Sequence, residues 1–263
     1  MAEASPETED LTCSISRRSA PPIPGLFFDP SLLLPADLAD SVLRSCMRAF
    51  FGGGGGSGSA VNQVMLFGRA GHESGSFPPF LSELLGATSA LLMQHPTLPR
   101  ETHAMLFPPT QHEHEHEDAD DADVLPRAAR QAIVNLYRPG EGIAPHVDLL
   151  RRFGDGIVGV SLGDGGVAMR FARVEPSRRE TGDGDAYEVW LPSRSVLVLT
   201  GEARYEWTHG IAPRVRDKVE VEGDDEGGWQ WQERGVRASV TFRWLLPGAD
   251  IVGGDSISDD GGE

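Results

Sequence analysis

GIVGVSLG (Gly156–Gly163) and RASVTFRWLL (Arg237–Leu246) are the stretches that decide how this chain of 263 residues folds. Each is short, rich in Val, Ile, Thr and aromatic residues, and bounded by Gly, Pro or Asp, which is typical of a β-strand. The same character recurs in the runs QAIVNLY (131–137), VAMRFARV (167–174), AYEVWLP (186–192) and SVLVLTG (195–201). Such a succession of short strands predicts a β-sandwich or jelly roll.

Two segments that precede these strands are predicted to be helical. Apolar residues recur at helical spacing over roughly 36–50, after the cap signals of Pro35-Ala36-Asp37, and again over Pro78–Gln94. Between them, the run VNQVMLFG (61–68) indicates a short apolar strand. We expect both helices to pack against one sheet, which gives a mostly β domain with flanking helices.

The acidic residues are concentrated outside the predicted strands. The chain has a formal net charge of −17, whereas Pro126–Pro247 contains 17 Lys and Arg against 18 Asp and Glu. We expect one domain over 23–248, preceded by a disordered leader (1–22), interrupted by an acidic low-complexity insertion (111–123) and followed by an acidic disordered tail (249–263). A nearly neutral core is compatible with a nucleic-acid substrate but predicts weak unaided electrostatic capture.

The chain carries no sign of export or membrane insertion. It has no apolar run of about 18 residues, and its first residues lack the apolar stretch of a secretory signal. Its two cysteines, Cys13 and Cys46, are not expected to form a stabilising disulfide. We expect a cytoplasmic or nuclear protein without membrane partners, and no pattern indicates its oligomeric state.

A His-x-Asp pair offers two metal ligands. His146 and Asp148 are two residues apart, so an extended segment would point both to the same face. His209 follows in WTHGI, where a turn after the 195–201 run would bring it across the sheets. Two histidines and one carboxylate leave the other coordination positions of a metal open, the arrangement of non-haem Fe(II) oxygenases. The pair alone is weak evidence, because such pairs also occur in surface turns.

Two arginines strengthen the case for a dicarboxylate ligand. Arg237 and Arg243 are separated by an even number of residues, so both guanidinium groups lie on one face of a strand. Inside a β-sandwich, each charge needs an anionic partner, and a bound dicarboxylate would supply it. The alternative is an edge strand with solvated arginines.

Together these motifs resemble the AlkB family of Fe(II)/2-oxoglutarate dioxygenases in order and spacing. The resemblance covers about half the chain. The matching stretches are Asn135–Tyr137, Pro139–Gly142, Pro145–Asp148, Val160–Gly163, Leu191–Ser195, Thr200–Gly201, Trp207–Ile211 and Arg237–Arg243.

The resemblance implies a double-stranded β-helix core, the jelly-roll form also called cupin-like, and a role for each site residue. His146, Asp148 and His209 are expected to ligate Fe(II) as the catalytic centre. Arg237 and Arg243 would bind the carboxylates of 2-oxoglutarate, with Asn135 and Tyr137 in contact with it. From the residues alone, the favoured explanation of Tyr137 is a core aromatic with a satisfied hydroxyl.

The activity that the resemblance implies consumes 2-oxoglutarate and molecular oxygen and releases succinate and carbon dioxide while a substrate C–H bond is hydroxylated. A hydroxylated N-methyl group leaves as formaldehyde, which amounts to demethylation. We expect the substrate to be a modified nucleobase in RNA or DNA. The alternatives are a protein side-chain demethylase or hydroxylase, which acidic segments would suit, and a non-catalytic jelly-roll binding module, which would have no need of every charged group of the site.

Three further patterns have a functional and a structural interpretation. Val61–Ala70 is similar to the region that covers the nucleotide in family members acting on bases, or is an edge strand. The cations of Arg69, Arg151-Arg152 and Arg214–Lys218 form a basic rim at the mouth of the site or, as is usual for charge runs, solvated faces. Trp229–Trp231 stacks on a base or, as we favour, anchors a loop on the sheet.

Overall fold

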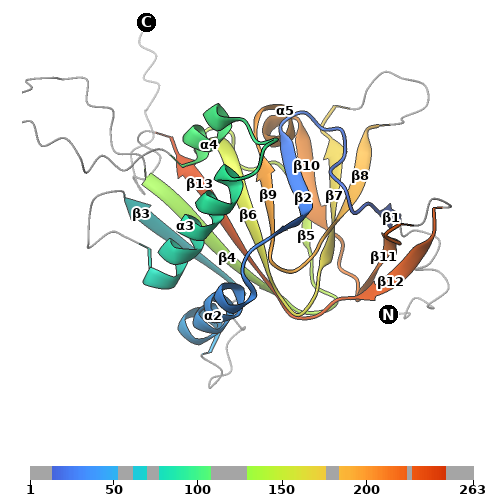
Figure 1. Cartoon of the computed structure of the whole chain (residues 1–263), viewed down its shortest axis with the longest axis horizontal. Helices are drawn as coiled ribbons and strands as arrows, with labels where there is room; N and C mark the ends of the chain where they lie inside the picture. The colour runs from blue at the N-terminus through green and yellow to red at the C-terminus, as the bar shows by residue number, and fades with distance from the viewer. Residues whose placement is uncertain are drawn as a thin grey trace, which may run out of the picture.

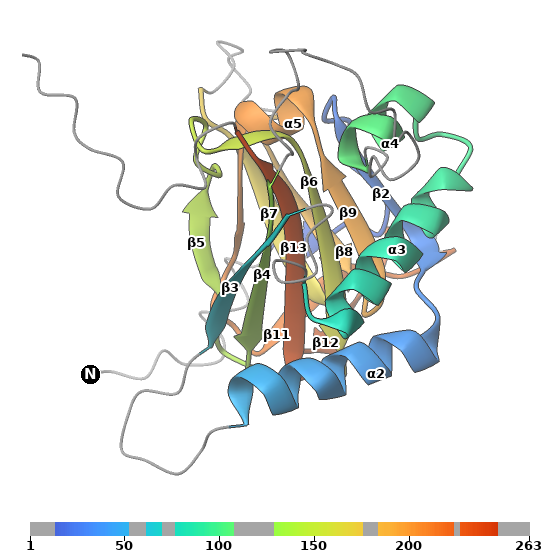
Figure 2. The same ribbon diagram turned by 90° about the vertical axis from the view of Figure 1, so that its left-hand side faces the viewer.

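The computed structural model describes residues 14–52, 62–69, 77–107, 129–175, 184–223 and 227–246 of the chain. Its centre is a pair of antiparallel sheets that face each other, with helices covering the outer face of the larger sheet (Figures 1 and 2). A third, smaller sheet lies beside them at the far end from the helices (Figure 1). The mostly β jelly-roll prediction is therefore confirmed.

Thirteen strands and five helical segments make up the described part of the chain. The strands are β1 (Ile15–Ser16), β2 (Leu26–Leu33), β3 (Gln63–Arg69), β4 (Ala129–Tyr137), β5 (Ile143–His146), β6 (Phe153–Gly163), β7 (Val167–Arg173), β8 (Ala186–Leu191), β9 (Ser195–Leu199), β10 (Trp207–Ile211), β11 (Arg216–Glu220), β12 (Trp229–Glu233) and β13 (Arg237–Leu245). The helical segments are α2 (Ala36–Cys46), the π-helical turn η1 (Met47–Phe51), α3 (Pro79–Met93), α4 (Arg100–Leu106) and α5 (Gly201–Tyr205).

The order of the strands separates a large sheet from a small one. The large sheet has the order β2-β9-β6-β13-β4-β3 and the small one β5-β10-β7-β8. In the large sheet β13 pairs with β6 on one side and β4 on the other, antiparallel in both cases. The chain thus crosses repeatedly between the two sheets, which is the winding of a double-stranded β-helix.

Alternation along β13 divides its side chains between two environments. Ala238, Val240 and Phe242 belong to the apolar core beneath the helices. Arg237, Ser239 and Arg243 alternate with them and therefore face the space between the sheets. One strand consequently supplies apolar side chains to the core on one face and both arginines to the cavity on the other.

The two predicted helices are present and cover the outer face of the large sheet. The helix expected over 36–50 is α2 followed by η1, and the one expected over 78–94 is α3. Val42 of α2 and Leu84 of α3 are fully buried against that sheet, and each such side chain stabilises the fold by about 1.5–3 kcal/mol. Within the described ranges, no helix is both long and apolar enough to cross a bilayer.

Strand β2 and helix α4 are among the elements that the sequence did not predict. The segment before α2 is strand β2, which pairs with β9 at the edge of the large sheet. Pro30 in its middle is tolerated because an edge strand has unpaired backbone groups on one side, and the pairing is irregular between Phe28 and Leu33. The short helix α4 was also missed, because one turn or two carry little periodicity.

The structure corrects the boundary of the expected disordered leader. Residues 1–13 lie outside the described residues, but Ile15–Ser16 forms β1, which pairs in parallel with β11. The Arg17 amide donates to the Glu188 carbonyl at 2.9 Å. A polar composition does not exclude this order, because a strand added to a sheet edge satisfies its backbone groups. The acidic insertion (111–123) and the tail (249–263) lie outside the described residues, so these assignments stay predictions.

The cations after His209 do not form a rim around the cavity. Arg214 and Arg234 both bind the fully buried carboxylate of Asp217, and Arg214 also pairs with Glu188 at 2.8 Å. This buried network joins the third sheet to the small sheet, so the basic-rim interpretation is wrong for Arg214. In the sequence, this run of charged residues looks like a solvated surface, so the buried pairing of Asp217 with two arginines could not be seen there.

Trp229 and Trp231 belong to a β-hairpin, β11–β12, and not to a loop. Their rings are in edge contact at 5.5 Å between centroids, and the Arg216 guanidinium lies 4.2 Å from the Trp231 ring centre. The rings therefore pack on the hairpin's own cations, and the segment expected to be a loop is strand β12.

We predict that Gly163→Ala destabilises the fold where β6 meets β13. Gly163 has φ +126°, and a methyl group there would lie 2.2 Å from the Val236 carbonyl oxygen. The expected loss is about 1–3 kcal/mol of unfolding free energy, measured by urea denaturation. Gly86→Ala in α3 is the control, because its methyl group meets open space and should stabilise by up to about 1 kcal/mol. Equal stability of Gly163→Ala and wild type would contradict the steric argument.

Candidate active site

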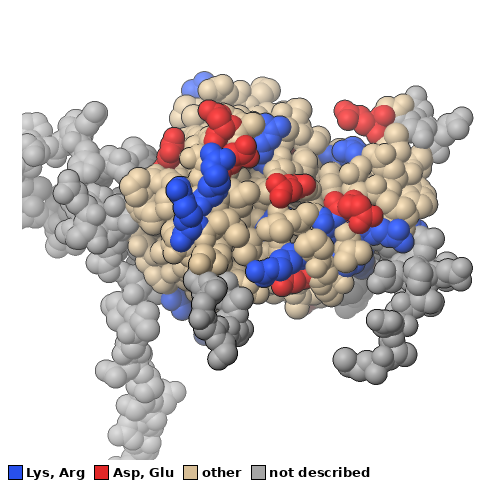
Figure 3. All heavy atoms as spheres, turned by 90° about the horizontal axis from the view of Figure 1, so that it is seen from below, with Lys and Arg blue, Asp and Glu red and all other residues tan. Residues whose placement is uncertain are grey.

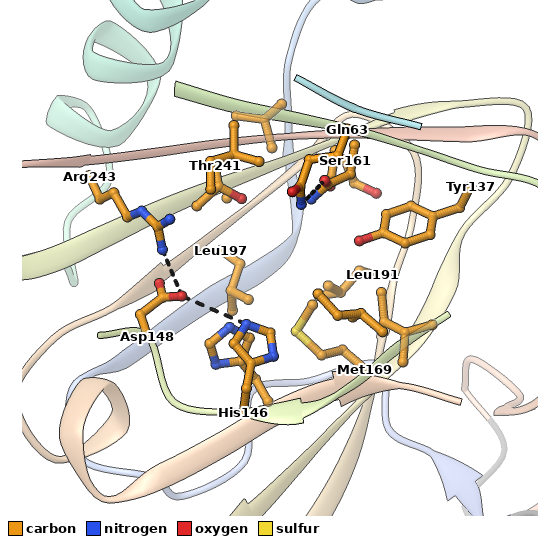
Figure 4. A pocket seen from close by; sticks show the side chains of 18 of the residues that line it. Gln63, Tyr137, His146, Asp148, Ser161, Met169, Leu191, Leu197, Thr241 and Arg243 are labelled. Carbon is orange, nitrogen blue, oxygen red and sulfur yellow. Dashed lines mark hydrogen bonds and ion pairs between the residues drawn. The ribbon is translucent and has the colours of Figure 1, made fainter. Parts of the chain in front are cut away.

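A cavity of about 410 Å³ lies between the two sheets (Figure 4). Both sheets and the edge strand β3 contribute to its wall. Its polar lining residues are Gln63, Asn135, Tyr137, His146, Asp148, Ser161, Ser195, His209, Arg237, Ser239, Thr241 and Arg243, and the rest of the wall is apolar. All seven residues that the sequence singled out for the site are among them.

The two histidines are brought together by strand pairing. His146 at the end of β5 stands opposite His209 of β10 in the register of the small sheet, with ring centroids 4.5 Å apart. Asp148 follows β5 on a loop and turns back toward them. One ligand atom from each of the three side chains lies within 4.8 Å of the others, a spacing that suits one metal ion.

The histidine rings are arranged for coordination. The Nδ1 of His146 is 2.9 Å from the Ala144 carbonyl oxygen, so Nδ1–H donates there and Nε2 keeps its lone pair. That Nε2 lies 3.7 Å from an Asp148 carboxylate oxygen. Burial, followed by the charge of His146, lowers the pKa of His209 to about 4. His209 is therefore neutral at physiological pH, the form that binds a metal.

Arg243 is held at the Asp148 carboxylate. Its Nη1 lies 2.7 Å from Asp148 Oδ1, its Nε donates to Gln131 at 2.9 Å, and it stacks 3.7 Å from the Phe153 ring centre. Burial lowers the pKa of Arg243, while Asp148 opposes that shift. The guanidinium of Arg243 thus orients the carboxylate of Asp148. The even spacing of the two arginines in the sequence did not reveal this role.

Arg237 is the arginine with unused hydrogen-bonding capacity. It is buried on β13, its Nε donates to Ser161 at 2.8 Å, and its Nη1 has no hydrogen-bond partner. Burial lowers the pKa of Arg237 to about 10, so the group stays charged at neutral pH. A buried N–H without an acceptor costs about 1–3 kcal/mol. An anionic oxygen bound in the cavity would satisfy it.

Tyr137 and Asn135 extend this end of the cavity. The Tyr137 ring lies 5.6 Å from the Arg237 guanidinium, and burial raises the pKa of its hydroxyl, which therefore stays protonated and able to donate. Gln63 of β3 donates to Asn135 Oδ1 at 2.8 Å, which leaves the Asn135 amide N–H groups as donors. Gln63 and Ser161 were missed by the sequence analysis. Nothing in the sequence marks these two residues. Only the strand register, which sets Gln63 opposite Asn135 and Ser161 opposite Ser239, shows that they line the cavity.

The donor set fits an Fe(II) ion and a dicarboxylate. Two neutral imidazoles and one carboxylate, His146, His209 and Asp148, would hold the metal on one side. Arg237 and Tyr137, with Asn135, would bind a carboxylate of 2-oxoglutarate through charged and neutral hydrogen bonds. Bound together, metal, co-substrate and oxygen supply the oxidising power, and the surrounding residues orient them and exclude water.

Comparison with known proteins places the chain in a family. The model of the 2OG-Fe(II) oxygenase superfamily matches residues 77–243, which include both histidines, Asp148 and both arginines. The chain therefore belongs to this superfamily and is a dioxygenase that uses Fe(II) and 2-oxoglutarate, as the sequence predicted.

Relatives of known sequence match about half of the chain or less. It is 40% identical over 121 residues to mouse tRNA (carboxymethyluridine(34)-5-O)-methyltransferase ALKBH8, covering 43% of this chain and 17% of that protein. It is 35% identical over 123 residues to uncharacterized protein L905 of Acanthamoeba polyphaga mimivirus, covering 47% and 51%. An Arabidopsis thaliana protein named alkylated DNA repair protein ALKBH8 homolog is 38% identical over 99 residues, covering 34% and 28%. The matched segments span about half or less of the length of these three relatives.

Two solved structures align over most of the chain. A Pseudomonas putida prolyl-4-hydroxylase has a TM-score of 0.47 at 15% identity, with 85% of this chain and 94% of that one covered. OsALKBH1 has a TM-score of 0.42 at 20% identity, with 84% and 98% covered.

We predict that Arg237→Met weakens 2-oxoglutarate binding about 10–100-fold and leaves metal binding unchanged. The change removes a charged hydrogen-bond donor, whose contribution is about 1.5–3 kcal/mol. Titration of the Mn(II)-loaded protein with 2-oxoglutarate in a calorimeter measures the affinity. Arg216→Met, on the hairpin outside the cavity, should bind like wild type. An unaltered affinity in Arg237→Met would remove this arginine from the co-substrate site.

Proposed function

We propose that this dioxygenase demethylates or hydroxylates a modified nucleobase in RNA or DNA, with His146, Asp148 and His209 as the iron ligands. The names of the relatives support this class of substrate: the mouse protein is named for a tRNA uridine and the Arabidopsis protein for alkylated DNA. The matched segment is a small part of the mouse protein, so the methyltransferase activity in that name is not carried over to this chain.

The observation that carries the proposal is an apolar cavity wall that continues onto exposed residues beside the metal ligands. Met65 on β3 and Leu149 after Asp148 line the cavity and are 52% and 63% exposed. Phe67, two residues along β3, is 45% exposed, and Leu150 is 54% exposed. Enzymes that modify a base take it out of its stack into such a pocket and hold it against apolar side chains. The cavity is large enough for a co-substrate with part of a base.

The charges on the face drawn in Figure 3 favour recognition of a single base over capture of a long duplex. Acidic and basic side chains are intermixed on the face drawn in Figure 3. Strong, sequence-independent binding of nucleic acid needs many Lys and Arg contacts to phosphate. We therefore expect modest affinity with weak salt dependence, and selectivity that comes from the pocket.

Protein substrates are the second candidate. The net charge of −17 and the acidic stretches outside the near-neutral core suit a basic protein partner. The chemistry at iron would be the same, so only the identity of the oxidised molecule separates the two candidates.

We predict that wild-type protein with Fe(II), 2-oxoglutarate and oxygen forms succinate, and that Asp148→Ala does not. Asp148 is the only carboxylate of the metal cluster found in the described residues, so its loss should lower metal binding and turnover by at least about 100-fold. Succinate is measured by mass spectrometry after oxygen is admitted to an anaerobic mixture. Turnover by Asp148→Ala equal to wild type would show that the iron lies elsewhere.

The substrate is identified by stimulation of that reaction. Panels of methylated RNA oligonucleotides, methylated DNA oligonucleotides and methylated basic peptides are compared for added succinate and released formaldehyde. Stimulation by nucleic acid supports the proposal. Stimulation by the peptides alone overturns it in favour of the protein-directed enzyme.

We predict that Met65→Ser raises KM for the stimulating oligonucleotide about tenfold, while succinate formed without oligonucleotide is unchanged. Loss of roughly 50 Å² of apolar contact accounts for a change of this size. Val215→Ser is the matched control, because Val215 is also exposed, at 47%, and lies outside the cavity. Equal KM values in the two variants would exclude Met65 from substrate contact.

A further inference from the structure

The buried arginine Arg204 lies on α5 beside the metal site and has no role in the assignments above. Its side chain is 2% exposed and is the largest fully buried side chain of the described residues. Burial of a guanidinium is costly unless acceptors compensate for lost water. The groups that Arg204 bonds to should therefore indicate why it is there.

Those acceptors are two consecutive carbonyl groups of the loop that carries Asp148. Arg204 Nη1 donates to the Asp148 carbonyl oxygen at 3.1 Å and Nη2 to that of Leu149 at 3.4 Å. The Nε has no hydrogen-bond partner, and the ion pairs found in the described parts of the chain do not include Arg204. The guanidinium is thus committed to the backbone of one loop.

The helix that carries Arg204 is held in place by other contacts. Glu202 of α5 accepts from Trp207 Nε1 at 3.2 Å and pairs with Arg173 of β7. The Gly201 amide at the start of the helix donates to the Asp155 carboxylate at 2.9 Å. The position of Arg204 therefore does not depend on the Asp148 loop.

The position of α5 in the chain links two metal ligands. It leads directly into β10, which carries His209, and β10 pairs with β5 and β7. Through Arg204, the same segment is bonded to the loop that carries Asp148. Asp148 and His209 reach the site from different parts of the sequence. The hydrogen bonds of Arg204 directly join the segment that leads into His209 to the loop that carries Asp148.

We infer that Arg204 is a positioning residue of the metal site, which holds the Asp148 loop so that its carboxylate meets His146 and His209. Its role differs from that of Arg243, which contacts the carboxylate itself. Arg204 bonds to the backbone of the Asp148 loop and so fixes the position from which the Asp148 side chain extends. The same bonds hold Leu149 at the mouth of the cavity. The inference rests on the iron ligands of the proposed function but is independent of the substrate.

The experiment measures metal binding without co-substrate or substrate. Mn(II) is titrated into wild type, Arg204→Met and Arg204→Lys, and free Mn(II) is followed by electron paramagnetic resonance. We expect Arg204→Met to weaken Mn(II) binding about 10–100-fold, because supporting residues around metal ligands have effects of this size. Arg204→Lys should recover part of the affinity, since one ammonium can donate to a carbonyl but lacks the guanidinium's fork.

A matched variant separates positioning from general stability. Arg130 is also buried, donates to the Leu106 carbonyl and stacks on Trp244, but it does not line the cavity. Arg130→Met should lose thermal stability while it binds Mn(II) like wild type. Wild-type Mn(II) affinity in Arg204→Met would overturn the inference.

Two further comparisons keep the outcome decisive. If Arg204→Met is insoluble, the Arg204→Lys variant decides the question. A loss of about threefold or more in its Mn(II) affinity would support the inference, and an unchanged Mn(II) affinity would contradict it. Asp148→Ala is titrated in parallel. Undiminished Mn(II) binding by Asp148→Ala would show that the iron-ligand assignment has failed, whereas its loss beside an unaffected Arg204→Met would show that only the role of Arg204 has failed.

Discussion

The ion pair between Arg243 and Asp148 joins the two facing sheets at the site and is the interaction on which the rest of the arrangement depends. Arg243 comes from the centre of the large sheet and Asp148 from a loop beside the small one. Each is almost fully buried, and either charge without the other would be unfavourable by several kcal/mol. The ion pair therefore ties the centre of the large sheet to the Asp148 loop across the cavity.

Much of the fold and most of the site could be predicted, because both depend on local patterns. Alternation along the strands determines which side chains share a face, so Arg237 and Arg243 were correctly grouped, as were His146 and Asp148. Strand β2 was not predicted, because its proline and aspartate are typical of turns and are tolerated only at an edge.

The sequence could not show which side chains from distant segments of the chain would contact each other. Gln63 and Ser161 are ordinary polar residues until strand register sets them against Asn135 and Ser239. Arg214 and Asp217 look like a solvated run, yet Asp217 is fully buried with two arginines. Long-range pairing of this kind leaves no periodic signal, since it depends on how the sheets are connected.

The pairing of β1 with β11 has a consequence for where this domain can be cut. Removing everything before residue 23 would take away the parallel partner of β11 and expose a row of unpaired backbone groups on the third sheet. Such an edge is a template for strand exchange between copies, so a protein shortened in this way would tend to self-associate although its catalytic centre is intact. A shortened protein that keeps this pairing has to retain Ile15–Ser16, inside a stretch that composition alone marks as dispensable.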